Sequence, residues 1–124
     1  MSISKQIEGK RGEDAAVAYL KKEGFQILDR NFRIRGGEID IIAIDATDGE
    51  AVLAFIEVKT RSSTEFGTPL EAITSWKLRA LIKTAQFYKL KHPRLPDLMR
   101  IDAVAVSVDR ETGNSTITLV KNIS

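Results

Sequence analysis

The sequence predicts an α/β domain in which one central mixed β-sheet is flanked by helices. Two segments carry apolar residues at helical spacing, and the segments around them alternate or run continuously as strands do. A third observation is Asp48-Gly49 between two apolar runs, which is a strong signal for a β-hairpin. The predicted order is helix, three strands, helix, two strands, which favours one sheet with helices packed on it.

The first helix is expected over residues 4–23, and Gly24 ends it. Glu13 shares a helical face with small and apolar residues. Gly9 and Gly12 each cost about 1 kcal/mol relative to alanine in a helix interior. Their presence predicts that a strand or a ligand comes close to this helix.

Three strands are expected next: residues 25–28 with a continuation through 30–35, then 38–46 and 51–60. If Asp48-Gly49 forms the hairpin tip, paired positions sum to 97, which places Asp40 opposite Glu57. A one-residue bulge would move Asp40 off this face, so the register is itself a prediction.

A polar loop at 61–67 precedes a short helical turn that begins at Thr68-Pro69. A second cap at Thr74-Ser75 begins a longer helix, whose buried stripe is predicted to be Leu78, Leu81, Ile82, Ala85 and Tyr88. Trp76 and Phe87 are interpreted as core or helix-packing residues, because only 6% of the chain is aromatic, which disfavours a base-stacking surface. Strands at 99–108 and 115–121 complete the fold.

Composition limits the functional classes. The 124 residues predict a single domain, 1–124, and the apolar and charged fractions, 43% and 29%, are those of an ordinary globular chain. The chain has no cysteine and one histidine, which excludes disulfides and thiolate metal sites and disfavours zinc. No apolar run is long enough to span a membrane and no secretory signal precedes the domain, so the expected compartment is the cytoplasm.

The most informative residues are Asp40, Glu57 and Lys59, which interrupt apolar strands. Charged residues are rarely buried without a partner, and Glu57 and Lys59 share one face because side chains alternate along a strand. Two ionised carboxylates about 5 Å apart repel by roughly 3 kcal/mol at an effective dielectric constant of about 20. A cation between them would relieve that cost, so the pattern indicates metal-dependent phosphodiester chemistry.

Several short motifs occur in one order along nearly the whole chain: Gly9-x-x-Gly12-Glu13, Arg30-Asn31, Gly37-Glu38-Ile39-Asp40, Glu57-Val58-Lys59-Thr60-Arg61, Gly67-x-Pro69-x-Glu71-Ala72 and Arg100-Ile101-Asp102. In this combination the chain resembles the PD-(D/E)XK nuclease superfamily, with its restriction-endonuclease-like fold. More specifically, it resembles the YraN-like family of predicted endonucleases. The departure is Ile39, where the superfamily name has proline.

The resemblance implies roles for individual residues. Asp40 and Glu57 would ligate Mg²⁺ or Mn²⁺, with the backbone carbonyl of Val58 as a third ligand. Lys59 would orient the attacking water or stabilise the developing charge. Glu13 would reach the site as an extra ligand or through water.

Basic residues are expected to bind nucleic acid. The net charge is only +2, but residues 77–100 contain seven basic residues and one acid. The residues assigned to contacts with DNA are Arg33, Arg35, Arg61, Lys77, Arg79 and Lys83. The alternative for this set is an ordinary solvated surface.

Two further acids, Glu38 and Asp102, are interpreted separately. Glu38 would cap the turn before it, pair with Lys59 or assist the metal. Asp102 is interpreted as a structural salt-bridge partner, with Arg100 as the candidate.

Three functions are compared. The first is a metal-dependent nuclease that hydrolyses DNA phosphodiester bonds, acting on double-stranded, branched or damaged DNA in repair or recombination. The second is a nucleic-acid-binding accessory module of the same fold with little or no catalysis, and the third is an interaction domain with a relic site. A homodimer is compatible with the resemblance, because branched-DNA nucleases of this fold use two sites.

Overall fold

A computed structural model describes residues 3–62, 71, 73–109 and 111–124. The elements follow one another as α1 (Ile3–Lys22), β1 (Gln26–Ile34), β2 (Gly37–Asp45), β3 (Val52–Ser62), α2 (Ser75–Lys91), β4 (Met99–Val108) and β5 (Ser115–Val120). The predicted order of helices and strands is therefore confirmed. The helical turn predicted from Thr68 lies almost entirely outside the described residues. Neither helix has a stretch long and apolar enough to cross a membrane.

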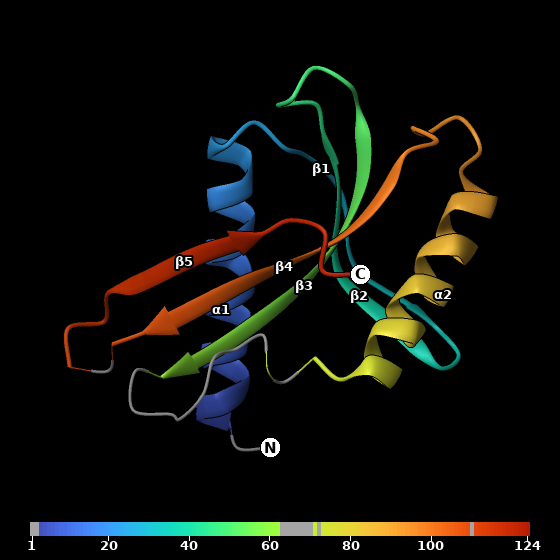
Figure 1. Ribbon diagram of the computed structural model, residues 1–124. Helices are drawn as coiled ribbons and strands as arrows, with labels where there is room; N and C mark the ends of the chain where they lie inside the picture. The colour runs from blue at the N-terminus through green and yellow to red at the C-terminus, as the bar shows by residue number, and fades with distance from the viewer. Residues whose placement is uncertain (1–2, 63–70, 72, 110) are drawn as a thin grey trace.

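The five strands form one sheet in the order β1-β2-β3-β4-β5. Strands β3 and β4 are parallel, and the other neighbouring pairs are antiparallel. Parallel neighbours need a crossover connection, and α2 supplies it. The sheet is therefore mixed, with α1 on one face and α2 on the other (Figure 1).

Each face of the sheet has its own apolar core. On the α1 face the buried residues are Ala16, Val17, Leu20, Phe25, Ile41, Ala43, Ala54, Ile56, Val104 and Val106. On the α2 face they are Ile39, Ile42, Leu53, Phe55, Leu81, Ala85, Tyr88 and Ile101, with Leu78 and Ile82 packed against them. The buried stripe predicted for the second helix is thus confirmed.

The hairpin has the predicted register. Pairs from Ile41–Ile56 to Asp45–Val52 all sum to 97. The tip contains Gly49 at a φ of +97°, a conformation that glycine adopts without steric cost. The first of these pairs, Ile41–Ile56, lies next to Asp40 and Glu57, but the predicted Asp40–Glu57 pair is not itself part of the ladder.

Gly12 brings α1 against β3. A Cβ atom built on Gly12 would collide with the Thr60 side chain. The prediction of a close approach is therefore confirmed for Gly12, and the approaching element is a strand. At Gly9 no described residue lies within 4 Å of a Cβ placed there, so no strand approaches at that position, and the ligand alternative stays a prediction.

A buried ion network joins three elements at the other end of the sheet. Arg100 donates from Nε to Asp102 at 2.7 Å and from Nη2 to Asp45 at 2.7 Å. Lys121 Nζ also lies 2.9 Å from Asp45. Thr47, Arg100 and Lys121 hold the pKa of Asp45 below its ordinary value, against the effect of burial. The structural role predicted for Asp102 is confirmed.

Candidate active site

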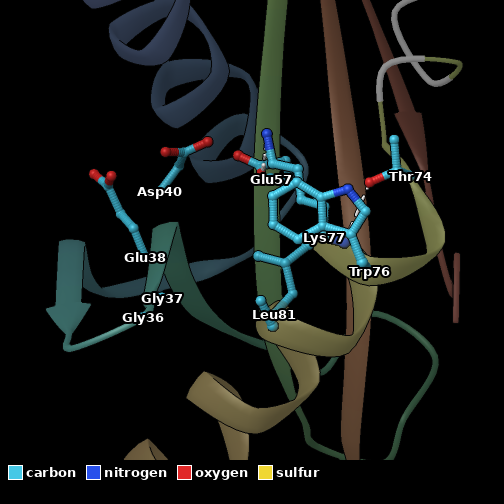
Figure 2. Close-up of a pocket in the computed structure, with 10 residues that line it drawn as sticks. Gly36, Gly37, Glu38, Asp40, Glu57, Thr74, Trp76, Lys77 and Leu81 are labelled. Atoms are coloured by element: carbon cyan, nitrogen blue, oxygen red, sulfur yellow. Dashed lines mark hydrogen bonds and ion pairs between the residues drawn. The ribbon is translucent and has the colours of Figure 1, made fainter.

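Asp40 and Glu57 lie on neighbouring strands and line one pocket between the sheet and the first turns of α2 (Figure 2). The pocket has a volume of about 450 Å³. Its other walls are the Gly36-Gly37 turn with Glu38, and Thr74, Trp76, Lys77, Ala80 and Leu81 of the α2 side. The fold thus brings together the two acids that interrupt the apolar strands.

A break in the alternation of β2 allows this arrangement. Ile39 and Ile42 both belong to the α2-side core, whereas Ile41 belongs to the α1-side core. Strict alternation would place Ile39 and Ile41 on one face. At the irregular position the Asp40 carboxylate accepts a hydrogen bond of 2.7 Å from the Val58 amide. Asp40 is therefore fixed to β3 by its side chain, next to Glu57.

The proximity of the two acids perturbs Asp40. Burial raises the pKa of Asp40, and the adjacent Glu57 carboxylate raises it further, to about 8. The Val58 amide and the Lys59 ammonium act in the opposite direction. Without a cation the pair therefore retains a proton near neutral pH.

Two lysines complete the site. Lys77 Nζ lies 3.6 Å from Glu57 Oε2. Burial lowers the pKa of Lys59, and the neighbouring Lys77 ammonium lowers it further. Burial acts to lower the pKa of Lys77, but its contacts with Lys59 and with the carboxylates of Glu57 and Asp40 raise it. The site therefore combines Lys77, a cation at the pocket that stays charged, with the neighbouring Lys59, which loses its proton more easily than usual.

Glu13 does not line this pocket; it lines a different one, together with Arg30 and Asn31. Its carboxylate accepts hydrogen bonds from Arg30 Nε at 3.0 Å and from Asn31 Nδ2 at 3.1 Å. Asn31 has a φ of +55° and sits across from Asp40, between the pairs Arg30–Ile41 and Phe32–Ile39. The structure thus joins Glu13 to the Arg30-Asn31 motif. Asn31 of this motif is the residue across from Asp40 on the neighbouring strand.

The predicted DNA-contacting residues lie in different surroundings. Arg33 pairs with Glu38 at 3.1 Å, so the partner of Glu38 is Arg33 of β1 and not the predicted Lys59. Four of the set are exposed: Arg33, Arg35, Arg79 and Lys83. Arg61 is half-buried on β3, two positions after Lys59.

The prediction that Trp76 and Phe87 are core residues is wrong. Trp76 and Phe87 are 66% and 41% exposed, so neither is a core residue. Trp76 stands in the first turn of α2, at the pocket that holds Asp40 and Glu57. Trp76 lies off the predicted buried stripe of α2, and this position in the sequence pattern indicates an exposed side chain.

The donor set fits a hard divalent cation. Asp40 and Glu57 offer carboxylate oxygens, the ligands that Mg²⁺ and Mn²⁺ prefer. The proton that Asp40 retains marks where a positive charge would be stabilised. Within the described ranges, no three His, Cys, Asp or Glu side chains gather as a metal site. Further ligands would therefore come from backbone oxygen, water or substrate.

Comparison with known proteins places the chain in a family. Residues 12–106 match the model of "Uncharacterised protein family UPF0102". A UPF0102 protein of Persephonella marina is 47% identical over 100 residues, covering 81% of this chain and 83% of the relative. One from Caldicellulosiruptor saccharolyticus is 40% identical over 120 residues, covering 97% and 98%. The chain belongs to the UPF0102 (YraN-like) family.

Proposed function

We propose that the chain is a metal-dependent nuclease that hydrolyses DNA phosphodiester bonds, and that its fold is that of the PD-(D/E)XK superfamily. The observation that carries this is the gathering of Asp40, Glu57 and Lys77 at one pocket, with Lys59 close enough to interact with all three. Paired acids beside paired amines suit a reaction in which a cation and a phosphate are held together.

Asp40 and Glu57 would hold Mg²⁺ or Mn²⁺, with the Val58 carbonyl as the expected third protein ligand. When bound, such an ion lowers the pKa of a coordinated water and neutralises charge on the phosphate. The Val58 amide keeps Asp40 in place by its 2.7 Å hydrogen bond.

Lys59 and Lys77 have different tasks in this proposal. The lowered pKa of Lys59 gives its Nζ a larger neutral fraction than an exposed lysine has, so it can orient the attacking water and take its proton. Lys77 remains charged and stabilises negative charge on the non-bridging oxygens. The water oxygen bonds to phosphorus as the bond to the leaving oxygen breaks.

Glu13 would act on the site indirectly, through the residues that it contacts. Its two hydrogen bonds to Arg30 and Asn31 place it beside the position across from Asp40. We expect it to influence the site through Asn31 or through water. Its substitution should therefore cost less than that of Asp40 or Glu57.

A cleavage assay tests the proposal. Purified protein is incubated with labelled linear, flapped and four-way-junction DNA in Mg²⁺, Mn²⁺ or EDTA. Glu57→Ala and Asp40→Asn should abolish cutting, whereas Asp48→Asn, an exposed acid at the hairpin tip, should leave it unchanged. Cutting that persists in both site variants belongs to a contaminant and contradicts the proposal.

The second candidate is an accessory module that binds nucleic acid without cutting it. It is favoured by α2, which contains five basic residues and no acid. In that case binding would not need metal, would weaken steeply with salt, and would be lost in Lys77→Ala/Arg79→Ala while Glu57→Ala binds normally. A homodimer remains a prediction, which light scattering at micromolar concentration tests.

A further inference from the structure

We infer that Trp76 is a stacking platform for an unpaired base next to the phosphate that is cut, so that the substrate is DNA with at least one unpaired nucleotide. The inference rests on the proposed nuclease function and names its substrate class. Trp76, the only tryptophan of the chain, is unusual because its side chain is 66% exposed. Large aromatic side chains normally bury most of their area.

The position of Trp76 connects it to the site. It belongs to the first turn of α2 and lines the same pocket as Asp40, Glu57 and Lys77. Figure 2 shows the indole standing beside Glu57 and Lys77 and facing outward from the helix. A nucleotide whose phosphate lies at the two acids therefore has its base within reach of this ring.

The other aromatic contacts give no alternative partner for Trp76. In the described part of the chain, stacked and edge contacts join Phe32, Phe55, Tyr88 and His92, and Lys91 covers Phe87. The indole takes part in none of these. Another wall of this pocket is the Gly36-Gly37 turn with Glu38.

The charges around Trp76 favour nucleic acid over a protein partner. Lys77 follows it directly, Arg79 lies three positions after it, and α2 has no acid along its 17 residues. Aromatic rings set among cations are the usual surface for single strands, where base stacking is tolerant of sequence. In a fully paired duplex the bases stack on one another and cannot reach an indole at the edge of a pocket.

The test uses the emission of Trp76, which is the sole tryptophan. The full-length protein is titrated in EDTA with a single-stranded thymine oligonucleotide and, separately, with a fully paired duplex. Binding is followed in the same samples by the anisotropy of a label on the DNA. The single strand should quench the emission strongly at saturation, and the duplex should bind with little quenching.

The DNA affinities of Trp76 variants provide an independent test of the stacking role. Base stacking is worth about 1–3 kcal/mol per base, which is about 5- to 150-fold in affinity. Trp76→Ala should weaken single-strand binding by that factor and duplex binding less than about twofold, while Trp76→Phe should keep part of the effect. Phe87→Ala is the matched control, an exposed aromatic on the same helix about 16 Å further along its axis.

The outcomes separate the two proposals. Binding without quenching, or equal affinities for Trp76→Ala and the parent, overturns the stacking role while metal-dependent cutting still stands. Equal quenching by duplex and single strand also overturns it. A dimer that Trp76→Ala converts to a monomer, with DNA affinity unchanged, assigns the ring to a protein contact instead. Absence of all DNA binding at low salt contradicts both proposals.

Discussion

At the scale of single residues, Asp40 carries most of the chemistry. Its carboxyl is held by the Val58 amide at 2.7 Å and stands next to Glu57. The pKa of Asp40 rises from 3.8 to about 8, so the folded protein keeps a proton that the unfolded chain loses near pH 4. This group therefore contributes stability that is complete below about pH 4 and is lost as pH rises through about 8.

We expect the metal-free protein to lose stability between about pH 5 and pH 9, and Asp40→Asn to flatten that slope. Mg²⁺ should raise the melting temperature of the parent more at pH 8.5 than at pH 6, because a bound ion must displace the proton. Thermal melts in EDTA and in Mg²⁺ at several pH values measure both effects. An equal Mg²⁺ shift in Asp40→Asn would refute this assignment.

Arg100 illustrates the opposite case, a charge whose partners are satisfied. It bridges Asp45 and Asp102, which are both buried. Arg100→Met should destabilise the fold by about 3–5 kcal/mol, because it leaves the buried Asp102 without its cation and Asp45 with Lys121 alone. Denaturant unfolding measures the loss. Arg94→Met, at an exposed arginine, serves as the control and should change stability by less than about 0.5 kcal/mol.

At the scale of elements, the contact of α1 with β3 depends on Gly12. A Cβ there would collide with Thr60, so Gly12→Ala should cost about 1–3 kcal/mol by overpacking. Gly9→Ala, in the same helix with open space around it, should instead stabilise by up to about 1 kcal/mol. Chemical denaturation of both variants tests the pair. Recovery in Gly12→Ala/Thr60→Ala would localise the clash, and equal stability of the two single variants would contradict it.

The sequence was sufficient for those elements whose signals are local. Asp48-Gly49 fixed the hairpin register, because a short tip leaves only one pairing that keeps the apolar faces together. The helical stripe ending at Tyr88 was likewise readable from its spacing. Glu57 and Lys59 could be placed on one face for the same reason, since alternation in β3 is regular.

Other features depend on contacts between distant segments. The pairing of Glu13 with Arg30 and Asn31 joins α1 to β1, and no local pattern encodes it. The exposure of Trp76 was not predicted, because the low aromatic content of the chain favoured a packing role, although Trp76 lies off the buried stripe of α2. The break in the alternation of β2 at Asp40 could not be located from the sequence, since only the three-dimensional cores show which face Ile39 occupies.

At the scale of the whole molecule, the two faces of the sheet have different tasks. The α1 face is an apolar core closed by Gly12, whereas the α2 face opens at one end into the pocket of Asp40 and Glu57. The Arg100 network closes the other end of the sheet. This division gathers Asp40, Glu57 and Lys77 in one place, where the proposed cation and phosphate would bind.

The most direct test of the central claim measures binding and cutting in the same samples. Glu57→Gln removes one charge but keeps the shape of the side chain, so its DNA affinity in EDTA should equal or exceed that of the parent. Its cutting rate in Mn²⁺ should fall at least about 100-fold, because one of the two carboxylates that hold the ion is lost. Cutting by Glu57→Gln at the parent rate, with equal DNA affinity, would contradict the account.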